Sequence, residues 1–349
     1  MSLEGGRRMG WVPRLECPIC ARVGEVRWEG VTDKVWHVPG EWCYRQCPSH
    51  DVLWLDPQPA NFFYSSTLYP VDYPTHDKPR DLLAPRQGWI ANSRLKVKCE
   101  ILRHSFGYPL ECRDTWAHLL GQMAAALPII RQWVGYTVRF LHARNGRLLD
   151  VGCGNGTFLM LMAKLGWKVM GIEPDAIAAR YAQDQGLEVV VGRLEDTKLE
   201  PESFDAITLS HVIEHIPDPV HVFKVLSCAL KPGGVLVSIS PNPCGMLSRI
   251  FGISWRALDP PRHLVLLGPR ALAELSCNFG LQPIVLTGNW NAEWVARESI
   301  SLRLYGDTFR YRRRWFPKLL AIVMAFLTLI QRTQGEEVVL IARKEEDSS

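Results

Sequence analysis

The sequence lacks several features that would restrict its function class at once. Residues 1–16 are basic and interrupted by Gly and Pro, so they contain no apolar core of signal-peptide length. Nowhere does an apolar run reach the roughly twenty residues that a transmembrane helix requires. Internal repeats and low-complexity tracts are also absent from the sequence. We therefore expect a cytoplasmic protein whose ten cysteines are mostly reduced, buried or bound to metal.

A large excess of charge of one sign is missing as well. The 40 Lys and Arg residues nearly balance the 36 Asp and Glu residues, and the net charge of +4 does not by itself indicate a nucleic-acid partner. Hydrophobic residues make up 47% of the chain and charged residues 22%, as in ordinary globular proteins. The length of 349 residues is enough for one large domain or two smaller ones.

The most informative segment present is the glycine-rich run at residues 148–156. Asp150 closes an expected buried strand, and three glycines follow at alternate positions: Gly152, Gly154 and Gly156. Such glycines allow a tight turn and bring backbone N–H groups close to a ligand. A helical segment follows, so the run predicts the opening of a nucleotide site. The dinucleotide fingerprint does not fit, because its third glycine position falls on Thr157 or Leu159.

The following segments alternate between expected strands and helices up to residue 345, which predicts a parallel doubly wound sheet. One strand ends in Glu173-Pro174, where an acid could accept hydrogen bonds from both hydroxyls of a ribose. The next strand is followed by Leu194-Glu195, and a further strand ends in Ser210 before a loop.

Taken in this order, the segments resemble class I S-adenosylmethionine (SAM) methyltransferases. The resemblance implies an α/β fold with a Rossmann-like, seven-stranded, mostly parallel sheet that ends in an antiparallel hairpin. It also implies SAM as cofactor, with Asp150 orienting the methionine end, Glu173 binding the ribose, and Leu194 and Glu195 flanking the adenine. The full implied SAM-binding set is Asp150, Gly152, Gly154, Gly156, Glu173, Pro174, Leu194, Glu195 and Ser210.

The composition divides the chain into three parts. Residues 1–70 are rich in Cys, Trp, Tyr and Pro and are expected to form a small module with an aromatic connector. Residues 71–145 begin as a Pro-rich linker and become helical, and residues 146–345 form the SAM-binding domain. That domain carries an insert at about residues 296–332.

Two short pairs in the first part predict a structural zinc site. Cys17-x-x-Cys20 and Cys47-x-x-His50 each place two ligands on one tight turn, and two such turns can close a tetrahedral Zn²⁺ site. The segment resembles the zinc ribbon that precedes some class I methyltransferases. Cys43 is a rival fourth ligand, and unrelated buried thiols or a redox pair are alternatives.

Two histidines are candidates for catalysis. His211 begins an H-x-x-E-H string, but the prolines that follow argue against the long helix that an inverted zinc-peptidase site would need. In the methyltransferase interpretation His211 and Ser210 border the sulfonium. His263 follows two prolines and could take a proton from an acceptor hydroxyl, because imidazole titrates near neutral pH. The alternative for His263 is a structural role.

The insert combines basic and apolar segments. Residues 303–318 carry six Lys or Arg and one acid, and residues 319–330 contain Thr328 as their single polar side chain. Twelve apolar residues are too few to span a bilayer. Residues 303–330 are therefore a candidate for peripheral membrane contact, with packing on the domain or a dimer interface as the alternatives.

These observations predict SAM-dependent methyl transfer, with O-methylation favoured by the candidate histidines. The expected acceptor is a small molecule, a glycan or a lipid-linked compound. A nucleic-acid methyltransferase and a SAM-binding protein without activity are the alternatives. The fourth strand ends in Ser210-His211 and lacks an N-P-P-[FYW] run, which disfavours nucleic acid.

Overall fold

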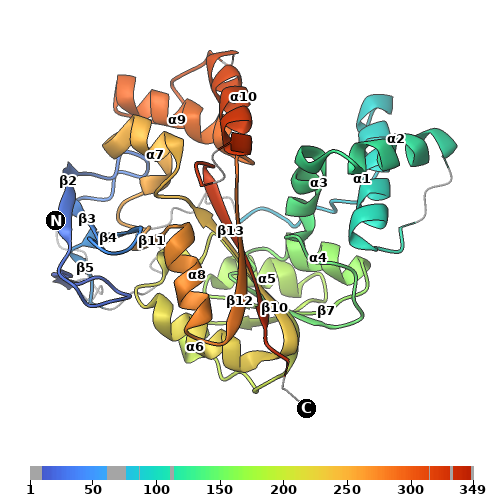
Figure 1. The fold of residues 1–349 in the computed structure, drawn as a ribbon, viewed down its shortest axis with the longest axis horizontal. Coiled ribbons are helices and arrows are strands. Elements are labelled where there is room, and N and C mark those ends of the chain that lie inside the picture. The colour runs from blue at the N-terminus through green and yellow to red at the C-terminus, as the bar shows by residue number, and fades with distance from the viewer. Residues whose placement is uncertain are drawn as a thin grey trace.

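The structure, a computed structural model, describes residues 10–60, 76–85, 87–110, 114–313, 315–330 and 333–346. A seven-stranded sheet forms its centre (Figure 1). Its strands are β6 (Arg147–Val151), β7 (Lys168–Glu173), β8 (Glu188–Val191), β9 (Phe204–Ser210), β10 (Leu230–Pro241), β12 (Leu281–Gly288) and β13 (Glu337–Lys344). They lie in the order β12-β13-β10-β9-β6-β7-β8, with β13 antiparallel to both neighbours and the pairs from β10 to β8 parallel. The predicted fold class is confirmed.

The parallel strands are buried because helices cover the sheet. In β9 every residue except Ser210 is buried, as expected for a strand with both faces covered. The covering helices are α4 (Thr157–Lys164), α5 (Ala176–Gln183), α6 (Pro219–Ala229) and α8 (Pro269–Cys277). Asp175 caps α5 by accepting the N–H groups of Ile177 and Ala178. Pro219 and the cap Asp218 define the start of α6 in the same way.

The N-terminal residues form a smaller sheet that borrows one strand from the main domain. Its own strands are β2 (Glu25–Val31), β3 (Trp42–Gln46) and β4 (Val52–Asp56). The fourth, β11 (Val265–Leu267), follows the fifth strand of the main sheet and pairs antiparallel with β4. A separate short pair joins β1 (Trp11–Val12) to β5 (Gln58–Pro59).

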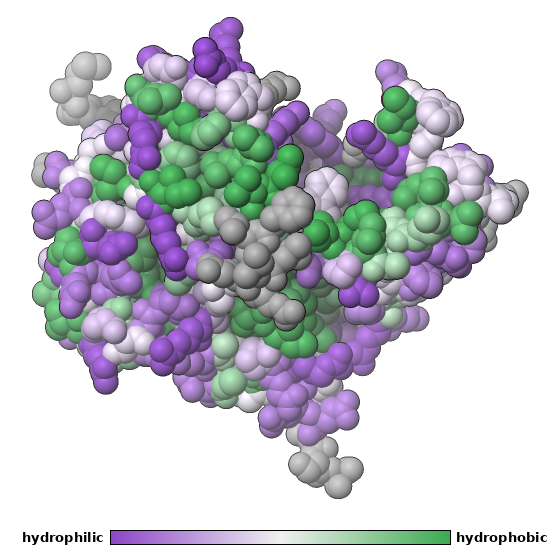
Figure 2. Space-filling model, turned by 45° about the horizontal axis from the view of Figure 1, so that its top comes forward, coloured by the Kyte–Doolittle hydropathy of each residue, from purple (hydrophilic) through white to green (hydrophobic). Residues whose placement is uncertain are grey.

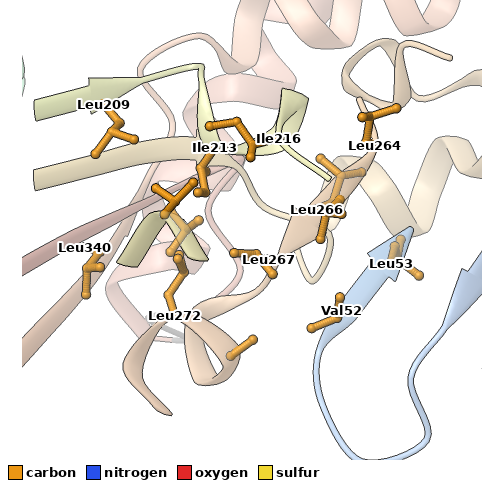
Figure 3. Close-up of a cluster of buried hydrophobic side chains, with 14 of the residues drawn as sticks. Val52, Leu53, Leu209, Ile213, Ile216, Leu264, Leu266, Leu267, Leu272 and Leu340 are labelled. Atoms are coloured by element: carbon orange, nitrogen blue, oxygen red, sulfur yellow. The ribbon is translucent and has the colours of Figure 1, made fainter. Parts of the chain in front are cut away.

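The two sheets share one hydrophobic core. Figure 3 shows Val52 and Leu53 of β4 beside Leu266 of β11, in the same cluster as Leu209 of β9. A buried ion pair also joins them, because Arg262 contacts Asp33 at 2.8 Å and Asp259 at 2.8 Å. The N-terminal module is therefore packed into the main domain.

Two groups of helices rise at one end of the main sheet (Figure 1). We call the first the helical arm: α1 (Trp89–Phe106), α2 (Thr115–Ala125) and α3 (Pro128–Gly135). The second, the insert lobe, consists of α9 (Ala292–Tyr305) and α10 (Trp315–Ile330), with α7 (Met246–Phe251) beside it. Among the described residues, 3₁₀ turns cover Tyr136–Val138, Leu194–Asp196, Ile213–His215, Gly252–Ser254 and Arg256–Leu258. Within the described ranges, no helix is both long enough and apolar enough to cross a membrane.

Candidate active site

Asp150 is the penultimate residue of β6, at the carboxyl edge of the sheet, and is fully buried. Its Oδ1 accepts a hydrogen bond from Thr208 Oγ1 at 2.8 Å and pairs with Arg139, while no described residue hydrogen-bonds to its Oδ2. Burial raises the pKa of this carboxyl. A buried acceptor without a partner needs one, and the amino group of the methionine end of SAM is chemically suited to be that partner.

The glycine loop after Asp150 makes the tight turn that its sequence predicts. Gly152, Gly154 and Gly156 all have positive φ, at 68°, 54° and 80°. A Cβ on Gly152 would lie 2.3 Å from Val212 Cγ2, in the loop that follows β9. The loop therefore requires glycine both for its conformation and for the close approach of a second site loop.

Glu173 ends β7 and connects this loop to the start of α5. Its Oε2 accepts the N–H of Gly154 at 2.7 Å, and its Oε1 accepts the N–H of Asp175 at 2.9 Å. Burial raises the pKa of Glu173 to about 7, although these two bonds oppose the shift. A carboxylate has about four acceptor positions, so two remain for ligand hydroxyls. Pro174, half-buried, follows it.

The next predicted residues lie after β8. Leu194 is buried in a 3₁₀ turn, and Glu195 beside it is exposed. A cavity of about 570 Å³ opens at Glu195 and is also lined by Arg193, Gln58 and His221. The N-terminal module thus contributes part of this wall.

Arg139 is a site residue that the sequence analysis missed. It has a positive φ of 48° at the end of the helical arm, and its guanidinium lies 3.7 Å from the centre of the Phe158 ring. Its Nη1 donates to Thr208 Oγ1 at 2.8 Å as well as pairing with Asp150. An arginine eleven positions before Asp150 belongs to no motif, so the sequence carried no signal for it.

His211 lies immediately after Ser210, where β9 ends, with an unusual φ of 55°. Its Nε2 lies 3.0 Å from Glu337 Oε1 and its Nδ1 lies 3.4 Å from Glu214 Oε1, while 40% of the side chain remains exposed. Burial favours the neutral imidazole, but the two carboxylates outweigh it and raise the pKa of His211 to about 10. His211 therefore carries a positive charge at neutral pH.

Glu337 contacts residues from three distant segments. Besides His211, its Oε1 accepts from the Tyr136 hydroxyl at 2.9 Å and from Asn291 Nδ2 at 3.0 Å. The Tyr136 ring stacks on Trp290, with centroids 4.9 Å apart. The helical arm, the loop after β9, the start of α9 and the start of β13 therefore meet at one carboxylate. Sequence reasoning identified only His211 among them.

His263, the second candidate for catalysis, is buried behind this group. Its Nδ1 donates to the Ala257 carbonyl at 2.7 Å, and its ring meets the His215 ring edge-on, with centroids 4.8 Å apart. Burial lowers the pKa of His263 to about 4, so the ring is neutral at pH 7. Ligand atoms of Glu214, His215 and His263 all lie within 4.8 Å of one another, so Glu214 approaches both candidate histidines.

The structure brings the four predicted metal ligands together. Each of Cys17, Cys20, Cys47 and His50 places one ligand atom within 4.8 Å of the others. Cys43 points elsewhere, with its Sγ 3.8 Å from Asp56 Oδ2. The outer nitrogen of His50, Nε2, lies 3.1 Å from Glu274 Oε2 on α8. A three-sulfur, one-nitrogen set with a carboxylate behind the histidine suits Zn²⁺.

The strand order, the glycine loop and the acid at the end of the second strand define a class I SAM-dependent methyltransferase fold. A family described as a methyltransferase domain matches residues 116–286. The chain is 31% identical over 181 residues to a protein from Xanthomonas euvesicatoria named ubiquinone biosynthesis O-methyltransferase, covering 48% of this chain and 76% of that one. A protein of the same name from Aeromonas salmonicida is 32% identical over 39% of this chain and 62% of its own length.

A solved SAM-dependent methyltransferase from Archaeoglobus fulgidus aligns with a TM-score of 0.41 at 22% identity, covering 62% of this chain and 91% of that one. The chain belongs to the class I SAM-dependent methyltransferases, and it is an enzyme of that activity.

Proposed function

We propose that this enzyme transfers the methyl group of SAM to a hydroxyl oxygen of a small molecule. The observation that carries the proposal is the His211–Glu337 contact at the carboxyl edge, since it holds a positively charged side chain beside the loop expected to border the cofactor. Both relatives described above are named as O-methyltransferases, which supports the same chemistry. SAM, when bound, supplies a methyl group on a positively charged sulfur, which is already a good leaving group.

The proposed cofactor contacts follow the geometry of the carboxyl edge. Asp150 accepts a hydrogen bond from the amino group of SAM, and Glu173 accepts hydrogen bonds from the ribose hydroxyls. Leu194 and Glu195 flank the adenine. The glycine loop gives the backbone close access, and Ser210 borders the reacting end. Arg139 joins this set through its pair with Asp150.

The proposed handling of the acceptor uses the two histidines differently. His211, whose two ring nitrogens face Glu337 and Glu214, lies beside the acceptor oxygen, and its positive charge stabilises the negative charge that develops there. His263, neutral and with Nδ1 committed to Ala257, accepts the hydroxyl proton on Nε2. The carboxylate of Glu214 stabilises the charged form of His263 that results.

The insert supports an acceptor that comes from a lipid surface. On α10, Trp315, Leu319 and Ile322 are exposed, and residues 303–318 supply basic charge beside them. We propose that residues 303–330 contact a membrane peripherally and that the acceptor is lipid-linked. Deleting such a basic-apolar segment would release the protein from anionic vesicles without weakening SAM binding.

We also propose a structural Zn²⁺ on Cys17, Cys20, Cys47 and His50. Protein purified without chelator should contain close to one zinc per chain. Changing Cys17 and Cys20 together to Ser should abolish that zinc and lower the melting temperature, since such sites contribute directly to folding. Metal-free wild-type protein by elemental analysis would contradict this assignment.

The proposed activity is tested by following labelled methyl groups from SAM. Matched phenol, alcohol, amine and thiol compounds are offered as acceptors, together with DNA and RNA. Label should appear as an ether on a hydroxyl compound and be lost in the His211→Gln variant. Label on an amine or a nucleic acid would contradict O-methylation. SAM binding without label on any acceptor would indicate a protein that has kept the cofactor and lost turnover.

A further inference from the structure

The helix α2 in the helical arm is built with its apolar side outward. Its buried positions are the small residues Ala117, Gly121 and Ala125, and a Cβ added at Gly121 would lie 2.3 Å from Glu100 Cβ on α1. The opposite face carries large apolar side chains that are between 41% and 63% exposed: Trp116, Leu119, Leu120 and Met123. These positions follow helical spacing, so they form one continuous stripe.

The next helix extends this stripe. Leu127, Ile129 and Trp133 at the turn and on α3 are 54%, 50% and 67% exposed. Soluble proteins seldom expose contiguous apolar patches of this kind unless the patch binds a partner. The arm thus offers a second apolar surface besides the insert lobe, and both appear as concentrations of apolar side chains in Figure 2.

The charge around these two surfaces is positive and therefore favours a negatively charged partner. The sequence has no Asp or Glu between residues 115 and 149, nor between residues 308 and 335. Arg131 lies on α3, and Arg312 and Lys318 lie beside or on α10. A protein interface between two copies would bring these cations together, whereas an anionic lipid surface attracts them.

The two surfaces are connected at the candidate site. Tyr136, which follows the arm, stacks on Trp290 at the start of the insert lobe. Both Tyr136 and Asn291 bind Glu337, the partner of His211. The arm and the insert lobe therefore lie on two sides of the position where the acceptor is proposed to react.

We propose that the outward face of α2 and α3 is a membrane-binding surface that acts with the insert lobe to seat the active site on an anionic lipid bilayer. This inference rests on the proposed function in one respect, the lipid origin of the acceptor. The apolar stripe enters the boundary between headgroups and acyl chains, and the basic side chains contact the headgroups. The acceptor then reaches His211 from the bilayer between the two surfaces.

The test is co-sedimentation of the full chain with phosphatidylcholine vesicles that contain about one-third phosphatidylglycerol. The variant Leu119→Gln/Met123→Gln removes apolar area without changing charge. Its control, Val23→Gln/Ile284→Gln, alters residues of matched exposure (64% and 61%, against 59% and 63%) outside the arm and the insert lobe. The arm variant should lower the partition coefficient at least tenfold, and the control should leave it within twofold.

Unchanged SAM affinity by calorimetry confirms that both variants are folded. Wild-type protein that does not bind these vesicles at low salt, or an arm variant that binds them as wild type does, overturns the proposal. The wild-type protein could instead fail to bind vesicles and sediment as a dimer that the arm variant abolishes. That result would overturn the proposal and show that the stripe binds a second copy of the chain. Vesicle binding is measured independently of turnover. If the protein does not methylate a hydroxyl, the vesicle-binding result therefore remains valid.

Discussion

The cofactor side and the acceptor side of the candidate site are built in contrasting ways. The proposed cofactor side consists of Asp150, Glu173 and Ser210, which lie at or next to the carboxyl ends of β6, β7 and β9, so strand position and local sequence pattern place them. The acceptor side joins Tyr136, His211, Asn291 and Glu337, which only the tertiary fold brings together. A short sequence motif is therefore enough to specify the cofactor side, whereas the acceptor side depends on where the fold places the arm and the insert lobe.

The sharpest way to separate the two sides is to remove His263. Loss of a general base costs about 10²–10⁴-fold in rate, so His263→Ala should lower turnover by that factor. SAM affinity should stay within a few-fold, because His263 contacts Ala257 and His215 instead of the glycine loop. Turnover with an identified acceptor and calorimetry with SAM are the two measurements. Near-normal turnover would assign His263 a structural role.

The converse experiment removes Glu173 from the cofactor side. A hydrogen bond to a charged group contributes about 1.5–3 kcal/mol, so Glu173→Ala should weaken SAM binding at least tenfold. Turnover at saturating SAM should change far less than in His263→Ala. An unchanged dissociation constant by calorimetry would refute the ribose-binding role, and Asp175→Ala serves as a control for loss of the α5 cap.

The two sides should also respond to pH in opposite directions. The pKa of Glu173 lies at about 7, so its acceptor form is lost as pH falls, and SAM affinity should decline by up to tenfold per pH unit below 7. The pKa of His211 lies at about 10, so its donor form is lost as pH rises, and turnover at saturating SAM should decline above that value. Glu173→Gln should remove the pH dependence of SAM affinity and leave the pH dependence of turnover unchanged. If it altered turnover and left SAM affinity as in wild type, the separation of cofactor side and acceptor side would be wrong.

The smallest expected effect comes from Tyr136→Phe. This change removes one hydroxyl from Glu337 but keeps the ring that stacks on Trp290. Because Glu337 keeps His211 and Asn291 as donors, losing this one bond should lower kcat/KM for the acceptor only about two- to tenfold, less than the full value of a bond to a charged group. SAM affinity should not change. A larger loss of SAM binding than of turnover would show that the arm serves the cofactor side.

The sequence predicted what depends on local pattern. The glycine run predicted a tight turn, and the strand alternation predicted the doubly wound sheet; both are present, with Gly152 at positive φ. The Cys17/Cys20 and Cys47/His50 pairs in the N-terminal module also come together as their spacing predicted, and Cys43 lies outside the cluster. Arg139 and Glu337 escaped prediction because each acts through partners far away in the chain, and no local pattern encodes such a contact.

His263 illustrates the same limit. Its position after two prolines made it a candidate base in the sequence, yet the residue is buried. Tyr44 of the N-terminal module donates its hydroxyl to the His263 carbonyl at 2.8 Å. That contact spans more than half of the chain, so only the folded structure places the imidazole behind His215.

The pairing of β4 with β11 also has a consequence during synthesis. The two strands are separated by about two hundred residues, so at about 5–20 residues per second the ribosome needs roughly ten to forty seconds to supply the partner. Until then, the edge of β4 offers unpaired N–H and C=O groups that another nascent chain can bind. The first segment made is thus among the last to be completed, and slow or paused translation should increase aggregation of the N-terminal module.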